Sequence, residues 1–561
     1  MPFTPSRLGP GAIYLRALDG FFRSNGDLIK VAEVEPQMLW TKGTLKDARP
    51  AGSPAERSHL ATLPQRILTH GVGYPIGGTV CDQTAHIAEF KRWNRELGVE
   101  WTSEHLSILH IPNGEITQSC GFLMPPIQNE AGVNLAVRNI VERRRALGLP
   151  FAFETGVNYF SPRDDEIPDG EFFAVTAQEA DCGILLDLTN LWINQQNGRA
   201  HILDILSTLP LDRVWELHLA GVEQERGYWV DTHSREIDPE VLALAAEIVP
   251  SLPNLGAIVF ELAPDRVASF GERAYLHEIE TLHRLWNRVS PAGSANDRHA
   301  TIVLPPRSLA VTPGQWEQTI AFHLLPEARR STVDATLSPM RRADEESFAL
   351  YSHLAGSFRS GALAELLGNT IRLLLLALGK EALQEFIDGY IASTPPSAFP
   401  TDEVVQFRRF LEANPTPVAG LNDLLTFEAS LVEAAANNSK VEVCVRGDIE
   451  ALLSDLAAGK LPASSLDRVP TVLEIDVDPV PSIRVVTNPF APRRAQVDEK
   501  RPYPANLCPL FCRVEFAGFG KDLGESIGEL IETMSGLAVR QRTAEHLDGV
   551  LSEEQRIENT F

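Results

Sequence analysis

Histidines and carboxylates recur at the ends of strand-like runs in the first half of the chain. Six such runs each end on one side chain that could bind a metal: His70, His105, Glu154, Asp187, His218 and Glu261. The loop segment VDTH adds Asp231 and His233, and Asn190 lies three residues after Asp187. Several imidazoles together with several carboxylates form a ligand set that suits iron, manganese or zinc. The residue types therefore predict a metal centre.

The alternative to a metal centre is a network of ion pairs. Burying this many carboxylates without partners is costly, and a bound cation would relieve that cost. Lys or Arg side chains could do the same, but none of the six strand ends carries one beside its ligand. Glu216, two residues before His218 on the same face, is either a further ligand or a partner that orients an imidazole. No cysteine lies at a strand end, which disfavours a thiolate zinc site or an iron–sulfur cluster.

The elements that would bring these residues together alternate between short β-like runs and amphipathic helices over residues 1–290. Two further runs, GAIYLR from Gly11 and IKVAEVEP from Ile29, raise the number of strands to eight. Between the runs, apolar residues such as Phe90 and Trp93 share one face at helical spacing. Eight such units predict an α/β fold, the (β/α)₈ TIM barrel, in which the C-terminal ends of all strands meet at one mouth. A doubly wound open sheet is the alternative, but it would normally place its ligand at a single switch point.

The chain changes character twice after the barrel. The stretch SPAGSANDR from Ser290 is small and polar, as is typical of a linker. A mostly helical pattern follows, and then the strand-like runs VLEIDVDP and SIRVVTNP, a Pro- and charge-rich connection and a helical end, ESIGELIETMSGLAVRQRTAEHL. We therefore expect a metal-binding barrel over residues 1–290, a helical domain over 300–440 and a small α+β region over 441–561.

Composition limits the class of protein. The net charge of -25 disfavours sequence-independent binding of nucleic acid, because such binding depends on Lys and Arg to neutralise the phosphates. No signal-peptide pattern begins the chain, and the longest apolar run, Leu373 to Leu378, is far below the ~20 residues of a membrane span. We expect a cytoplasmic protein with reduced thiols and no nucleic-acid or membrane partner. Cys508 and Cys512 could form a redox pair or a metal site, but their spacing favours two small semi-buried residues. Arg143 to Arg145 are interpreted as a solvated helix face.

Residues 8–290 resemble the multinuclear non-heme iron-dependent oxidative enzymes, the family of the iron enzyme of methanobactin biosynthesis. The resemblance lies in the ordered segments GAIYLRALDGFF, AEVEP, HGVGYPIGG, SEHL, FETGVNY, LLDLTNLWIN, ELHLAG, VDTH and FEL. It implies a xylose-isomerase-like barrel that holds two or three iron ions, Fe(II) or Fe(III), with dioxygen as co-substrate. The substrate it implies is a ribosomally made precursor peptide, often modified at cysteine.

The resemblance also implies roles for individual residues. By matching motifs, the iron ligands at the strand ends would be His70, His105, Glu154, Asp187, His218 and Glu261. Glu154 would bridge two ions, and a neighbouring or third site would be completed by Asn190, Asp231 and His233. Catalysis is expected to depend on Glu154, Asp187 and His218. The sequence departs from the family pattern at Glu104, where Asp is more common, and at Thr155, where Asn is more common.

The middle of the chain resembles the helical partner protein that is often encoded beside these enzymes. The similar stretches are SFRSGALAELLGN, LALGKEALQEFIDGYIASTPPS, FRRFLEANPTP and GLNDLLTFEASLVEAA. That partner helps to present the precursor peptide. We expect a fusion in which the helical domain replaces a separate partner protein and raises its effective concentration. The region 441–561 is expected to include a small peptide-recognition element.

Three functions are compatible with these observations. The leading hypothesis is an iron- and dioxygen-dependent oxidoreductase that modifies a cysteine of a precursor peptide. The second is a hydrolase or isomerase on the same kind of barrel, with zinc or manganese polarising a substrate oxygen. The third is a non-catalytic peptide-binding assembly protein with a structural metal. The second predicts activity without dioxygen, and the third predicts a peptide that leaves with unchanged mass.

Overall fold

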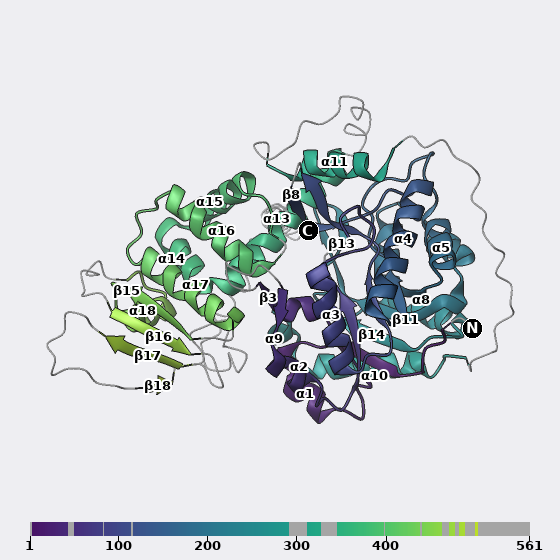
Figure 1. The fold of residues 1–561 in the computed structure, drawn as a ribbon, viewed down its shortest axis with the longest axis horizontal. Helices are drawn as coiled ribbons and strands as arrows, with labels where there is room; N and C mark the ends of the chain where they lie inside the picture. The colour runs from purple at the N-terminus through teal and green to yellow at the C-terminus, as the bar shows by residue number, and fades with distance from the viewer. Residues whose placement is uncertain are drawn as a thin grey trace, which may run out of the picture.

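Eight short, largely buried strands form a closed parallel barrel in the first half of the computed structural model (Figure 1). The structure describes residues 3–42, 50–81, 84–113, 116–290, 311–326, 345–397, 399–437, 440–462, 471–476, 482–487 and 500–502. In order around the barrel the strands are β1 Gly9–Ile13, β2 Val31–Val34, β5 Arg66–Gly71, β6 Thr102–His105, β9 Phe151–Glu154, β10 Gly183–Asp187, β11 Val214–Ala220 and β14 Ala257–Glu261. β14 pairs with β1 and closes the ring. The eight predicted runs are these eight strands, which confirms the predicted fold class.

Strand register places the candidate ligands side by side at one end of the barrel. The strands are apolar on both faces because helices cover the outside and side chains fill the inside. His105 on β6 lies directly beside Glu154 on β9, and Asp187 on β10 lies beside His218 on β11. Glu261 on β14 pairs with Ala220, the last residue of β11. The register therefore brings residues far apart in sequence to one mouth.

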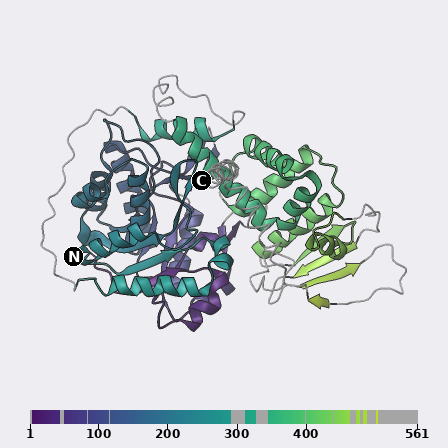
Figure 2. The same ribbon diagram turned by 180° about the vertical axis from the view of Figure 1, so that it is seen from behind.

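Helices surround the barrel, as Figures 1 and 2 show. They are α1 Asp19–Ser24, α2 Pro54–Leu60, α3 Thr84–Leu97, α4 Glu130–Leu147, α5 Asp169–Ala180, α6 Leu188–Gln196, α7 Ile202–Thr208, α8 Pro239–Ile248, α9 Val267–Phe270 and α10 Glu272–Trp286, with short 3-10 turns at Arg16–Leu18, Pro36–Leu39, Leu211–Arg213, Val249–Ser251 and Pro264–Arg266. α3 buries Phe90 and Trp93 as the apolar spacing predicts. α4 begins where the Asn129 side chain accepts a hydrogen bond from Gly132 N–H and ends at Gly148, whose φ of +73° favours glycine.

Three antiparallel hairpins project from the loops of the barrel. They are β3 Trp40–Lys42 with β4 Pro50–Gly52, β7 Ile108–Asn113 with β8 Ile116–Met124, and β12 Val222–Glu225 with β13 Tyr228–Asp231. The last of them turns through Arg226 and Gly227, which both have positive φ, as a two-residue hairpin turn requires. Because β13 ends at Asp231, this hairpin carries one of the candidate ligands.

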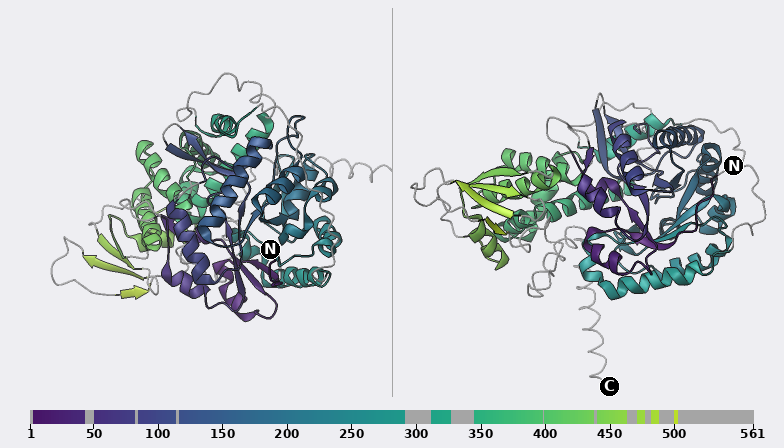
Figure 3. Two further views of the ribbon diagram at one scale, coloured as in Figure 1. Left: turned by 45° about the vertical axis from the view of Figure 1, so that its right-hand side comes forward. Right: turned by 60° about the horizontal axis from the view of Figure 1, so that its bottom comes forward.

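The second half of the described chain is helical and then forms a small sheet. The helices are α11 Pro313–Leu324, α13 Glu345–Leu366, α14 Gly368–Leu378, α15 Lys380–Ser393, α16 Pro400–Ala413 and α17 Leu421–Asn437. β15 Val441–Val445, β16 Thr471–Asp476, β17 Ser482–Thr487 and β18 Lys500–Pro502 form an antiparallel sheet, with α18 Ile449–Ala457 in the connection after β15. Figure 3 shows the sheet on the side of the helices away from the barrel. The predicted linker after Ser290, most of the Pro-rich connection, the C-terminal helix and both Cys508 and Cys512 lie outside the described residues.

Helix α13 belongs to two hydrophobic cores. Phe348, Tyr351 and Leu354, in its first half, pack into the core of the barrel. Leu363 and Leu366, in its second half, pack into the core shared by the later helices and the small sheet. The helix therefore joins the two halves of the molecule through continuous packing.

The length and apolarity of the helices decide whether any of the described residues could cross a membrane. No single helix among them is long and apolar enough to cross a membrane, and α13 with α14 satisfies the length and composition criteria only as a pair bent by 103°.

One buried carboxyl outside the metal centre makes stability depend on pH. Glu278, on α10, is buried, and its Oε2 has no hydrogen-bonding partner among the described residues. Burial raises the pKa of this carboxyl from 4.5 to about 7. Between these values the folded state binds more protons than the unfolded state, so the free energy of unfolding falls as pH rises through this window and stays lower above it.

Glu278→Gln should therefore raise the free energy of unfolding by about 1–3 kcal/mol at pH 8 and change it little at pH 4.5. Urea unfolding at the two pH values measures the effect. Glu280→Gln, on an exposed position of the same helix, is the matched control. An equal gain at both pH values would contradict this assignment.

Candidate metal centre

The side chains predicted at the six strand ends converge at the C-terminal mouth of the barrel. One group contains His70, His105 and Glu154, and a second contains Glu154, Asp187, His218 and Glu261. Within each group, the nitrogen and oxygen atoms that could bind an ion lie within 4.8 Å of one another. Glu154 belongs to both groups, so the two candidate sites are adjacent.

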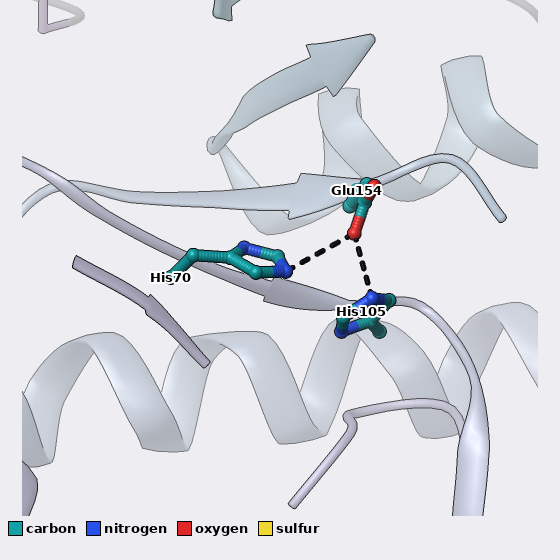
Figure 4. Close-up of side chains that lie close together, drawn as sticks. All are labelled: His70, His105 and Glu154. Atoms are coloured by element: carbon teal, nitrogen blue, oxygen red, sulfur yellow. Dashed lines mark ion pairs between the residues drawn. The ribbon is translucent and has the colours of Figure 1, made fainter. Parts of the chain in front are cut away.

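The first group is a pair of imidazoles that face one carboxylate oxygen (Figure 4). Oε2 of Glu154 lies 3.2 Å from Nε2 of His70 and 2.9 Å from Nε2 of His105. The other ring nitrogens are engaged elsewhere: Nδ1 of His70 lies 2.8 Å from Oγ of Ser103, and Nδ1 of His105 lies 3.0 Å from the carbonyl oxygen of Gly71. Such outer contacts fix the tautomer of an imidazole and leave Nε2 available to a metal.

The second group is centred on His218. Its Nδ1 lies 3.0 Å from Oε1 of Glu261 and 3.7 Å from Oε1 of Glu154. Burial by itself lowers the pKa of His218, but the charges of Glu261 and Glu33 outweigh burial and raise the pKa well above its ordinary value. Burial, followed by the charge of Glu261, raises the pKa of Asp187 well above its ordinary value. Negative charge is therefore concentrated here, as at a site built for a cation.

The residues of the VDTH loop form a third set beside the second group. Nε2 of His233 lies 2.9 Å from Oδ1 of Asp231 and 3.3 Å from Oε2 of Glu261. His233 has a φ of +49°, an uncommon conformation for a residue other than glycine. Residues held in such conformations cluster at functional sites, where the surrounding structure compensates for the strain.

Two carboxylates divide their oxygens between neighbouring sets. Glu154 presents Oε2 to His70 and His105 and Oε1 to His218. Glu261 presents Oε1 to His218 and Oε2 to His233. Each of these carboxylates therefore faces two neighbouring sets, one with each oxygen, as a ligand shared between two cations would.

Asn190 lies against Asp187 at the start of α6. The backbone N–H of Asn190 donates to Oδ1 of Asp187, and its side-chain Nδ2 donates to Oδ2 of the same carboxylate, at 2.8 and 3.0 Å. The side-chain amide oxygen of Asn190 is buried and has no hydrogen-bonding partner among the described residues. That oxygen is thus available as a neutral ligand beside an anionic one.

Buried polar atoms that make no hydrogen bond indicate whether the residues of this centre suit a metal. Among the described residues, six buried atoms of the centre make no well-aligned hydrogen bond, although all but the Asn190 oxygen lie in the close His–carboxylate pairs described above: Glu154 Oε2, Asn190 Oδ1, His218 Nδ1, Asp231 Oδ1, His233 Nε2 and Glu261 Oε2. Buried polar groups are rarely left unsatisfied unless an ion or a water completes them. All six are nitrogen or oxygen atoms of the kind that iron, manganese and zinc accept. The residues present therefore fit a bound metal.

Two further buried acidic residues lie close to His218: Glu33 on β2 and Glu216 on β11. Oε2 of Glu33 lies 3.0 Å from Nε2 of His218, so the other ring nitrogen faces the ligands. Burial, followed by the charge of Glu33, raises the pKa of Glu216 well above its ordinary value. Nε1 of Trp101 donates to Oε2 of Glu216 at 2.9 Å. Of the two sequence-based interpretations of Glu216, this arrangement favours the orienting role.

The sequence prediction did not include Glu33 or Glu35. Both lie in the AEVEP run, two residues apart and therefore on the same side of the chain near the end of β2. Burial raises the pKa of Glu35, and His70 and Glu261 are among the charges that act on it. The sequence signal for these two residues is a pair of glutamates two positions apart near the end of a strand. Both side chains lie on the same side of that strand, and the strand ends at the same barrel mouth as the others.

The predicted solvated position of Arg143 is wrong. It was expected on a solvated helix face, but it is buried and donates from Nη2 to the carbonyl oxygens of Tyr74 and Cys81, both at 3.1 Å. Its Nη1 lies 3.9 Å from Oε2 of Glu104. A Cβ at Gly71 would lie 2.3 Å from that same oxygen, so glycine leaves room for the Glu104 carboxylate.

Both departures from the family pattern lie next to ligands. Oε1 of Glu104 accepts the backbone N–H of His105 at 3.1 Å. Oγ1 of Thr155 accepts the backbone N–H of Asp187 at 3.0 Å. Each of these two side chains therefore holds the backbone of a candidate ligand in place, but neither is itself a candidate ligand.

Comparisons with known proteins relate the barrel part of the chain to one sequence family. The sequence model of the family described as "RiPP precursor modification enzyme MbnB/TglH/ChrH", where RiPPs are ribosomally made and then modified peptides, matches residues 46–268. A UPF0276 protein of Vibrio parahaemolyticus is 32% identical over 232 residues, 40% of this chain and 79% of that protein. A UPF0276 protein of Chromobacterium violaceum is 29% identical over 217 residues, 39% of this chain and 77% of that protein.

Solved structures give a weaker likeness. D-psicose 3-epimerase from Clostridium cellulolyticum H10 is 10% identical and covers 51% of this chain and 100% of its own, with a TM-score of 0.34. A xylose isomerase domain protein from Planctomyces limnophilus is 14% identical and covers 51% of this chain and 99% of its own, with a TM-score of 0.33. The barrel assignment rests on the strand order described above.

Proposed function

Since this chain belongs to the family of RiPP precursor modification enzymes MbnB/TglH/ChrH, we propose that it uses iron and dioxygen to oxidise a cysteine side chain of a ribosomally made precursor peptide. The observation that carries this proposal is the sharing of Glu154 and Glu261 between three neighbouring sets of ligand atoms. Such sharing supports two or three ions in one centre, whereas a single-metal hydrolase or isomerase needs only one set.

Each set would hold one ion. His70 and His105 with one oxygen of Glu154 would hold the first, and Glu154, Asp187, His218 and Glu261 would hold the second. Glu261, Asp231 and His233 would hold the third, with Asn190 beside Asp187 as a further oxygen ligand. When bound, iron supplies the redox chemistry with dioxygen.

The protein's own side chains fix the ligand geometry. Ser103 and the Gly71 carbonyl oxygen orient the imidazoles of the first set, and Glu33 orients His218. Losing such an outer contact typically costs ten- to 100-fold in metal affinity or activity. Glu154 is shared between two sets, and Asp187 and His218 belong to the middle set, so we assign these three residues the central role in catalysis.

Exposure indicates the side from which the peptide approaches. The side chains of His70 and His218 are 2% and 0% exposed, whereas those of Asp231 and His233 are 21% and 28% exposed. A peptide side chain can thus reach the centre from the Asp231–His233 side. A cysteine thiolate arriving there would add a soft sulfur ligand to a nitrogen and oxygen set, as iron accepts.

The later parts of the chain would bring the peptide to this mouth. In this proposal residues 1–290 form the oxidase, residues 300–440 act as a fused partner that presents the precursor peptide, and residues 441–561 contribute to its recognition. The contacts of α13 with the loops of the mouth support a presenting role, because a peptide held there would lie close to the centre.

Metal content provides the first test. Protein reconstituted with Fe(II) without oxygen should retain two or three irons per chain, and Mössbauer spectra after exposure to dioxygen should show a coupled ferric pair or a mixed-valence signal. Retention of one zinc or manganese, with no iron, would favour the hydrolase or isomerase function. A cysteine-containing precursor peptide that binds and leaves with unchanged mass would favour the non-catalytic assembly.

A further inference from the structure

Helix α13 contacts the loop that follows Glu154. Oγ of Ser347 donates to the carbonyl oxygen of Tyr159 at 2.9 Å, and the backbone N–H of Tyr159 donates to Oη of Tyr351 at 3.2 Å. The ring of Tyr351 also packs against that of Tyr159, with 5.2 Å between centroids. One residue of the loop is therefore held on both sides of its backbone by two side chains of the same helix.

The same helix contacts the β12–β13 hairpin. Nε2 of His353 is paired with Oε1 of Glu225, the last residue of β12 before the turn. The ring of Tyr159 meets that of Tyr228, the first residue of β13, edge to face at 6.4 Å. α13 thus contacts this hairpin directly through His353 and indirectly through Tyr159, and the hairpin ends at Asp231.

The hairpin is held from the barrel side by a different set of bonds. Nδ2 of Asn197 donates to the carbonyl oxygen of Trp229, and the backbone N–H of Trp229 donates to Oδ1 of Asn197, both at 2.9 Å. Asn197 follows α6, so the barrel secures one edge of β13. α13 contacts the end of β12 beside the turn, so the two sets of contacts act on different strands of the hairpin.

We propose that α13 is a positioning element for the Asp231–His233 side of the metal centre, acting through His353 and Tyr351. This inference rests on the ligand assignment in the proposed function. Asp231 and His233 are the candidate ligands that most need such support, because they lie at the end of a hairpin outside the barrel and just after it, and His233 is held at positive φ. His70 and His105 lie on barrel strands and do not depend on the hairpin.

Binding of Zn(II) and, without oxygen, of Fe(II) tests the proposal directly. In the double variant Tyr351→Phe/His353→Ala, one class of sites should bind at least about tenfold more weakly, as on the loss of other contacts that orient ligands. The remaining sites should keep their affinity. Ser352→Ala, at an exposed position of the same helix, is the matched control. His353→Gln can still donate to Glu225 and should restore much of the affinity.

A double variant that keeps its circular dichroism spectrum and binds every ion as tightly as the unmodified protein does would overturn the proposal. Zn(II) supports no dioxygen chemistry, so the binding result stands or falls independently of the oxidase function. Failure to oxidise any peptide would refute the proposed function and leave this inference intact.

Hydrogen exchange tests the reciprocal effect. Coupling between two sites acts equally in both directions, so metal binding should slow amide exchange in residues 345–354 of α13. The slowing should disappear in Asp231→Ala, which retains His70, His105 and Glu154. Unchanged exchange in α13 when metal saturates the unmodified protein would show that the helix and the centre are not coupled.

Discussion

Glu154→Gln should remove at least one bound iron per chain and lower the rate of peptide modification by about 10³-fold or more. The amide offers one neutral oxygen in place of two anionic ones, so at most one of the His70–His105 and His218 sets keeps an oxygen ligand from this residue. A catalytic metal contributes several kcal/mol to the transition state, and each 1.36 kcal/mol corresponds to a tenfold change in rate. Iron analysis and mass spectrometry of the treated peptide measure the two effects.

The matched control for this change is Glu179→Gln, at an exposed position of α5. It makes the same chemical substitution away from the centre and should leave both measurements unchanged. Glu154→Gln protein that retains the full iron content and modifies the peptide normally would remove Glu154 from the centre. Circular dichroism separates loss of metal from loss of fold.

Glu403→Ala should lower the free energy of unfolding by about 3–5 kcal/mol, because it leaves the buried charge of Arg359 without its carboxylate partner. Both oxygens of Glu403 lie 3.1 Å from Nε of Arg359, and one of them accepts the hydroxyl of Tyr390 at 2.5 Å. The backbone N–H of Ser397 donates to the other oxygen at 2.8 Å. These contacts tie α13, α15 and α16 together around one buried carboxylate.

Denaturant unfolding followed by circular dichroism measures this loss. Glu412→Ala, on the same helix, breaks an exposed ion pair with Arg408 and should cost less than about 1 kcal/mol. Since Arg359 lies on α13, loss of Glu403 should also weaken metal binding at the Asp231–His233 side. A cost for Glu403→Ala no greater than that for Glu412→Ala would show that the buried pair contributes little to stability.

Apolar strand runs that end on a ligand-type side chain made the barrel predictable. His70, Glu154 and His218 each end such a run, and parallel strands in a barrel have only one mouth at which their C-terminal ends can meet. Side-chain burial was less predictable. Arg143 sits in a run of three arginines that suggested a solvated face, yet it turns inward because carbonyl oxygens of the loop after β5 accept its N–H groups.

The sequence by itself determined the eight strands, their common mouth and the histidines and carboxylates gathered there, because these follow from local apolar patterns and from one topological rule. Only the tertiary structure decided how the oxygens of Glu154 and Glu261 are divided and that Glu33 orients His218 from 185 residues away. It also decided that α13 packs into two cores and holds the hairpin of Asp231. These features depend on rotamers and on contacts between distant segments, which no local pattern of residue types encodes.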